Sequence, residues 1–198
     1  MADQPRKTAF FDLETEQLFE DLGMESKWSR DPSKLSIACA CLKINDTPCK
    51  VYLKDQAQDL FKELQSCDLI VGHNLFSFDY SVLQGAVHQP VANILNTKTL
   101  DMLVEIEKKV SQRVALNDLA KLNLGQEKTE DSRSVPFMWR TGKRQQVIDY
   151  CINDVEMTKH LYEFARAHKK LKYTAKTMDF KTGERLIIGV KEVEVDWK

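Results

Sequence analysis

An apolar stretch that ends in acidic residues constrains this chain more than any other feature of its sequence. Residues 8–16 read Thr-Ala-Phe-Phe-Asp-Leu-Glu-Thr-Glu, and the short apolar run is typical of a buried strand. Side chains two positions apart on a strand point to the same face. We therefore expect Asp12 and Glu14 to project together, with Leu13 turned the other way.

Two neighbouring carboxylates repel each other, and burial raises the pKa of at least one of them. A cation removes this conflict, and a site made only of oxygen ligands suits hard ions such as Mg²⁺ or Mn²⁺. The pattern alone is weak evidence for a metal site, because most acidic pairs are simply solvated. Pairs with the same spacing also occur at Glu14/Glu16 and Glu192/Glu194.

The composition fits one globular domain without a membrane segment. The chain has 198 residues, 42% hydrophobic and 30% charged, which is enough to bury a core. Its net charge of −1 provides no overall basic field, so a nucleic acid would be held by a local patch or through metal. The longest apolar run, residues 35–42, is too short to cross a bilayer. We find no secretory signal, and five cysteines without metal-finger spacing indicate free thiols in an intracellular, cytoplasmic compartment.

The periodicity of the chain predicts an α/β fold. Residues 35–44 and 49–54 read as strands joined by turn residues, so the first three strands are consecutive and antiparallel. Further strands are predicted at residues 69–72 and 97–100. Helices are predicted at residues 55–64, 102–110, 116–122 and 143–168, with another helix starting at residue 78.

The rest of the chain is predicted to hold one long loop and a terminal hairpin. Residues 125–142 carry no pattern apart from residues 135–140, as in a functional or mobile loop. A β-hairpin follows, with strands near 171–180 and 185–195. We divide the chain into a domain at residues 1–170 and a hairpin extension of the same domain at residues 171–198.

Two further motifs accompany the acidic strand. Asn74-Leu-Phe-Ser-Phe78-Asp79 lies where a predicted strand leads into a helix, and helix capping alone could explain the acidic residue there. Tyr150-Cys-Ile-Asn-Asp154 lies on the late helix, where residues four apart share one face.

The three motifs, in this order, resemble the tyrosine branch of the DEDD superfamily of 3′–5′ exonucleases (DEDDy). The resemblance covers residues 9–164 in order and spacing and does not include the terminal hairpin. It implies a ribonuclease-H-like fold: a mixed central sheet of three antiparallel strands and then parallel strands, flanked by helices. The elements predicted above from periodicity agree with that fold.

The resemblance also implies roles for the motif residues. The ligands of two divalent metal ions, Mg²⁺ or Mn²⁺, would be Asp12, Glu14, Asp79 and Asp154. Tyr150 would orient the attacking water, since a tyrosine with an ordinary pKa of about 10 is a poor base at neutral pH. Asn74 and Phe78 would shape the substrate pocket, and Leu13 would contact the terminal base, although packing or turn formation explains each of the three equally well.

Several cationic and aromatic residues precede the late helix, where they could meet an entering strand. They are Trp139, Arg140, Lys143 and Arg144. An aromatic ring can stack on bases and a cation can contact phosphate, but a surface loop with one buried tryptophan explains the same residues. We interpret His73 as structural.

The main hypothesis is a metal-dependent 3′–5′ exonuclease that hydrolyses single-stranded DNA or RNA with a free 3′ end to nucleoside monophosphates. A non-catalytic module on the same fold, which binds nucleic acid or recruits a polymerase or helicase, is the alternative. A calcium-stabilised structural cluster fits less well, because EF-hand spacing is absent and Tyr150 would have no task.

Overall fold

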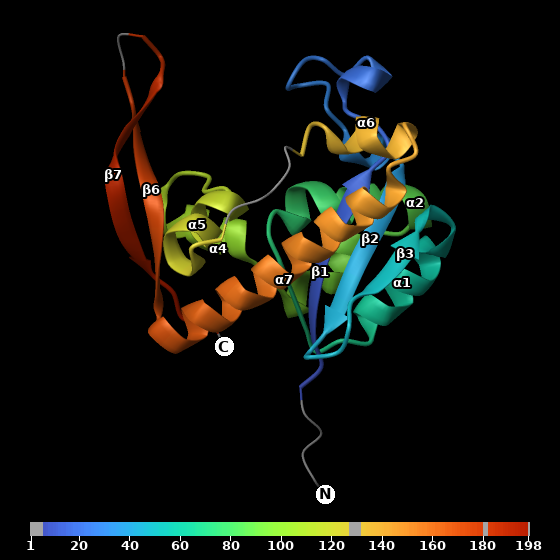
Figure 1. Ribbon diagram of the computed structural model, residues 1–198, viewed down its shortest axis with the longest axis horizontal. Helices are drawn as coiled ribbons and strands as arrows, with labels where there is room; N and C mark the ends of the chain where they lie inside the picture. Colours follow the sequence, from blue (N-terminus) through green and yellow to red (C-terminus); the bar gives the residue numbers. More distant parts are fainter. Residues whose placement is uncertain (1–5, 127–131, 180–181, 198) are drawn as a thin grey trace, which may run out of the picture.

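A five-stranded mixed sheet forms the centre of the computed structural model, which describes residues 6–126, 132–179 and 182–197 (Figure 1). The strand order is β3-β2-β1-β4-β5. Strands β1, β2 and β3 are antiparallel neighbours, whereas β4 and β5 run parallel to β1. Their bounds are Thr8–Thr15, Ile37–Ile44, Lys50–Leu53, Leu69–Gly72 and Thr99–Asp101. The predicted ribonuclease-H-like fold class is confirmed.

Helices cover both faces of the sheet because the strand residues alternate between two cores. Phe10 belongs to the core under the long helix α7 (Arg144–His168). Side chains of α4 (Met102–Val110) and α5 (Leu116–Leu124) pack in the same core. Its neighbour Phe11 belongs to the opposite core. That face is covered by α1 (Ala57–Gln65), α2 (Tyr80–Val87) and α3 (Val91–Leu95).

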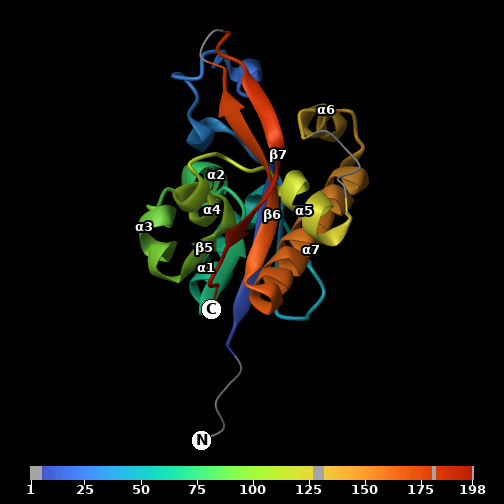
Figure 2. The ribbon, with the colours of Figure 1, turned by 90° about the vertical axis from the view of Figure 1, so that its left-hand side faces the viewer.

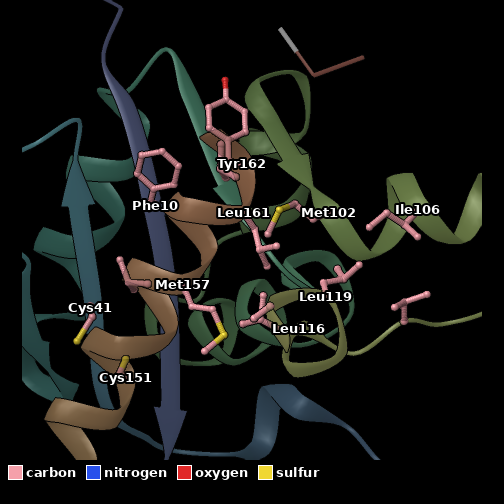
Figure 3. Packing of buried hydrophobic residues seen from close by; sticks show 14 of the residues in the cluster. Phe10, Cys41, Met102, Ile106, Leu116, Leu119, Cys151, Met157, Leu161 and Tyr162 are labelled. Carbon is pink, nitrogen blue, oxygen red and sulfur yellow. The ribbon is translucent and has the colours of Figure 1, made fainter. Parts of the chain in front are cut away.

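The first core is where α7 crosses the sheet. Figure 3 shows Phe10 of β1 next to Tyr162 of α7, and their ring centroids are 5.6 Å apart. The same view shows the sulfur of Cys151 near that of Cys41. All five cysteines are free thiols, as predicted. This packing fixes α7 over β1, and therefore fixes any side chain of α7 that faces the end of that strand.

The terminal hairpin consists of β6 (Lys170–Met178) and β7 (Arg185–Glu194), paired antiparallel. Its base is packed into the first core: Leu171 and Val193 are buried there, and Trp197 stacks on Tyr162. The rest of the hairpin extends past α5 and away from the central sheet (Figure 1).

Three details differ from the sequence-based expectation, the first being α3, which no predicted helix covers. The predicted loop at residues 125–142 contains a short buried helix, α6 (Val135–Arg140), which has a proline in its first turn, where the missing N–H costs nothing. The turn before α2 is a π-helix, η4 (Leu75–Asp79). Short 3₁₀ turns occupy Glu20–Leu22, Pro32–Lys34, Lys54–Gln56 and Asn96–Lys98. Among the described helices, none has the length and apolar character to span a bilayer.

Candidate active site

Three acidic side chains converge where β1 ends beneath α7. One carboxylate oxygen each from Asp12, Glu14 and Asp154 lies within 4.8 Å of the other two. The first two are half-buried and share the face of β1 that Phe10 turns toward α7, and Asp154 is buried on that helix. Carboxylates this close repel one another, and hard divalent ions prefer such an all-oxygen set. The residues present therefore fit a divalent metal site.

A thiol holds the first of these acids. The Sγ of Cys151 lies 3.5 Å from the Asp12 carbonyl oxygen and 3.7 Å from Asp12 Oδ2, and it can donate its one proton to either oxygen. Cys151 lies one turn before Val155 on the core side of α7. Its thiol contact with Asp12 links this helix directly to the acidic end of β1. The link lies between Tyr150 and Asp154 in sequence.

Asp79 lies next to this three-residue group, against the backbone of β1, but is not one of the three acids whose oxygens lie within 4.8 Å of one another. It is 3% exposed, and its Oδ1 accepts a hydrogen bond of 3.1 Å from the backbone N–H of Leu13. Burial, and then the charge of Asp12, raise the pKa of Asp79 well above its ordinary value. A carboxylate that is costly to ionise beside other acids is a group that a bound cation would stabilise.

A second buried acid positions the turn that carries Asp79. The Asp101 carboxylate accepts hydrogen bonds from the N–H groups of Asn74 at 2.8 Å and Phe76 at 3.0 Å. It also caps α4 by accepting from Leu103 N–H at 3.1 Å. Asn74 has a left-handed backbone with φ of 74°, so the turn needs such support. No local sequence pattern indicates this link to η4.

The four acids of the three motifs, but not Asp101, line an open cleft of about 850 Å³. All five predicted catalytic residues lie along it: Asp12, Glu14, Asp79, Tyr150 and Asp154. Of the predicted substrate contacts, Leu13, Asn74 and Phe78 also line the cleft. The tyrosine is buried and precedes Asp154 by one helical turn, so both side chains face the same space.

The remaining predicted contacts lie outside the described lining of the cleft. Trp139 is 8% exposed and packs in the first core, and the guanidinium of Arg144 lies 5.2 Å from its ring centroid. Arg140 Nη1 donates to Asp21 Oδ2 at 2.6 Å and to the Glu16 carbonyl at 3.1 Å. In this structure Arg140 therefore fastens α6 to the segment that follows β1.

The cleft also contains Arg113, which the sequence did not single out. Arg113 Nη2 donates to Asn74 Oδ1 at 2.6 Å and its Nη1 lies 3.6 Å from Glu107 Oε2, while the half-exposed guanidinium lines the cleft. It lies between two helices in a polar stretch without a motif, so no local signal marks it. His73 also lines the cleft, and its Nε2 lies 2.9 Å from the Val114 carbonyl oxygen, which fits a structural role.

An apolar recess of about 290 Å³ adjoins the cleft and shares Glu14, Asn74 and Phe78 with it. Phe19 packs edge-on against Phe78 with ring centroids 6.3 Å apart. Leu18, Leu35 and Pro136 complete the apolar wall. A flat apolar group that enters the cleft can therefore lie against aromatic and aliphatic side chains next to the acids.

Comparisons with known proteins agree with this geometry. A protein-family model described as 3′–5′ exonuclease matches residues 11–167, which include all three motifs. The structure of the family B DNA polymerase from the hyperthermophilic archaeon Pyrobaculum calidifontis resembles the chain with a TM-score of 0.59 and 16% identity. The match covers 81% of this chain and 24% of the polymerase chain, so the chain spans about a quarter of that protein. At this identity the likeness shows the fold alone. A search of curated proteins found no match.

Proposed function

Because the chain belongs to the 3′–5′ exonuclease family, we propose that it is an active member that degrades single-stranded DNA or RNA from the 3′ end. The products would be nucleoside monophosphates. One observation carries the proposal: oxygens of Asp12, Glu14 and Asp154 lie within 4.8 Å of one another in a cleft shared with Asp79 and Tyr150. Carboxylates this close repel one another, and a bound cation would relieve that repulsion.

The four acids would hold two divalent ions, Mg²⁺ or Mn²⁺, which when bound would activate water and neutralise charge on the scissile phosphate. We assign Asp12, Glu14, Asp79 and Asp154 as the residues that hold them. The hydrogen bond from Leu13 N–H keeps Asp79 in place beside the acidic strand. Cys151 does the same for Asp12 from α7.

Other residues of the cleft would bind the substrate. Tyr150 would hold the attacking water by a hydrogen bond, because its hydroxyl-bearing side chain lines the cleft one turn from Asp154. Arg113 is a cation at the cleft and would contact a phosphate of the entering strand. Phe78, packed on Phe19, would support the terminal base in the adjoining recess.

A gel assay tests this proposal. Single-stranded DNA and RNA of one sequence, labelled at the 5′ end, are incubated with the protein in Mg²⁺, Mn²⁺ or EDTA. We expect a metal-dependent ladder that shortens from the 3′ end. Asp154→Asn should remove it, whereas Asp149→Asn, an exposed acid of the same helix, should not. Intact oligonucleotides in every lane, with folded protein, would instead indicate a non-catalytic binding module.

A further inference from the structure

The indole of Trp28 is 96% exposed, which makes it the most exposed of the large apolar side chains that the structure describes. It lies on the β1–β2 segment (residues 16–36), which begins directly after the acidic end of β1. The other two tryptophans, Trp139 and Trp197, are buried. An indole has far more apolar surface than an aliphatic side chain, so a ligand that covers this ring removes a large apolar area from water.

The turn that carries Trp28 is fixed by its own hydrogen bonds. The Ser26 carbonyl accepts from the N–H of Ser29 at 2.9 Å and from its Oγ at 2.8 Å. The N–H of Trp28 donates to Ser26 Oγ at 3.3 Å. Asp31 N–H donates to Met24 Sδ at 3.4 Å, which closes the loop behind the turn. The indole is therefore presented on an ordered backbone, and a ligand that binds it orders little further chain.

A series of packed side chains connects this turn to the cleft. The guanidinium of Arg30, two residues after Trp28, lies 5.3 Å from the ring centroid of Phe19. Phe19 packs on Phe78, which lines both the cleft and the recess. Two residues span at most about 7 Å of chain, so Trp28 lies on the outer side of the recess wall. Figures 1 and 2 show the β1–β2 segment at the same end of the molecule as α6, from two sides.

The charges near the turn are largely balanced. Three arginines pair with two acids of the β1–β2 segment: Arg30 and Arg133 with Glu20, and Arg140 with Asp21. These pairs also hold the segment against α6. Beside the indole, Lys27 and Glu25 are exposed, and neither forms an ion pair with a described residue. One cation and one acid give no net attraction for a polyanion, so the turn would bind a nucleic acid by stacking more than by charge.

We propose that Trp28 stacks on a base of the single-stranded substrate, on the 5′ side of the nucleotides held in the cleft and the recess. This inference rests on the proposed function. A strand whose last base lies in the recess against Phe78 passes the Phe19 side of the wall as it continues outward, and Trp28 is the next ring along that wall. An indole stacks on any base, whereas the bases of a duplex are already stacked on each other. Trp28 is therefore a binding residue that favours single strands long enough to reach it.

A protein partner fits this surface less well. The neighbours of the indole in sequence, Lys27 and Ser29, are exposed and polar. A stable protein interface buries about 800 Å² on each side, with an apolar centre. One ring between polar residues matches a stacking contact with one base instead.

Tryptophan emission and binding affinity provide the first test. Because Trp139 and Trp197 are buried, the long-wavelength part of the emission reports Trp28. A twelve-nucleotide oligothymidylate is added in Mg²⁺ to protein that carries Asp154→Asn, so that the strand stays intact, and anisotropy of a 5′ label gives the affinity. We expect saturable quenching of the Trp28 emission. In the same background Trp28→Ala should weaken binding about tenfold, the loss of one base stack, and Trp28→Phe should retain most of the affinity.

A scan with abasic sites locates the contact along the strand. One base at a time is removed from the oligonucleotide, starting at the 3′ end. We expect the protein with Trp28 to lose affinity when a base on the 5′ side of the last two is removed, and the Trp28→Ala protein to be insensitive at that position. Removal of the terminal base should weaken both proteins equally.

Several results would overturn the stacking contact. They are unchanged emission with bound oligonucleotide, equal affinities of the Trp28 and Trp28→Ala proteins, equally strong quenching by a duplex, sensitivity to Trp28→Ala only at the terminal base, and no binding by anisotropy. The nuclease proposal fails separately. Quenching and coupling as expected, with intact oligonucleotides when the protein without substitutions is used in the gel assay, would retain the contact and refute the nuclease.

Discussion

The backbone N–H of Leu13 donates a 3.1 Å hydrogen bond to the buried carboxylate of Asp79. Leu13 lies between Asp12 and Glu14, so this bond ties the second acidic motif to the first through the main chain. A backbone donor cannot be removed by changing a side chain, and the relative placement of the three acids is therefore a property of the fold.

Metal should stabilise the protein without substrate. Mg²⁺ or Mn²⁺ that binds only the folded state at a hundred times its dissociation constant contributes about 2.7 kcal/mol. We expect the melting temperature of EDTA-treated protein to rise on addition of either ion. Asp12→Asn should reduce the shift strongly, and Asp149→Asn should preserve it. Melting curves that do not respond to metal would contradict the four-acid site.

Asp79 should make the metal-free protein less stable as pH rises. Burial raises its pKa in the folded state, so the stabilising protonated form is fully present below the unfolded pKa of about 3.9. This contribution is lost as pH rises through the elevated folded pKa, and at neutral pH ionisation costs stability. Asp79→Asn should therefore raise the melting temperature in EDTA at pH 7 and flatten its pH dependence over this window. Thermal melts from pH 4 to 8 measure both effects.

The same Asp79→Asn variant should lose activity while it gains stability. A metal ligand contributes several kcal/mol to the transition state, which corresponds to about a thousandfold in rate. A single-turnover assay on the preferred oligonucleotide measures the loss. Retention of wild-type activity would exclude Asp79 from the reaction.

Asp101 should matter for both the fold and the nuclease. Each oxygen of the Asp101 carboxylate accepts a hydrogen bond from a backbone N–H, so Asp101→Asn places an amide NH₂ against one of these donors. A buried donor left without an acceptor lowers the stability of the fold by about 1–3 kcal/mol. We expect a lower melting temperature and, because η4 carries Asp79, a higher metal concentration for half-maximal activity. The exposed Asp59→Asn is the control. A change in stability with an unaltered metal requirement would limit Asp101 to a structural role.

Tyr150→Phe should reduce kcat and leave the metal-induced melting shift intact. The phenyl ring keeps the packing of the buried side chain, but the hydroxyl that would orient water is gone. Poor orientation of a reacting group costs about tenfold to a hundredfold. An equal loss of metal binding would show that the tyrosine supports the acids instead.

Arg113→Ala should weaken substrate binding more than chemistry. A hydrogen bond to a charged group contributes about 1.5–3 kcal/mol, so KM should rise roughly tenfold to a hundredfold. Lys108→Ala, an exposed cation of the preceding helix, should have little effect. The ratio of KM values at one salt concentration is the measurement, and an unchanged KM would exclude a phosphate contact.

Local sequence patterns were enough to predict the strands, the long helix and the acidic motifs. The alternation that buries Phe10 also places Asp12 and Glu14 on one face of β1, and the helical period that buries Cys151 places Tyr150 and Asp154 together. These relationships depend on residues two to four apart, so periodicity contains them. That the five predicted catalytic residues line a single cleft was implied by the family resemblance, and it requires the packing of β1, η4 and α7 against one another.

Contacts between distant segments could not be predicted in this way. Trp139 and Arg140 have the composition of a strand-binding loop, yet the tryptophan is buried and the arginine is bonded to Asp21, far away in sequence. The link from Asp101 to Asn74, the position of Arg113 and the hydrogen bonds between β6 and α5 depend on which elements lie side by side. The packing of the whole chain decides which side chains are buried and which residues form hydrogen bonds and ion pairs with each other. A short stretch of sequence therefore cannot predict these contacts.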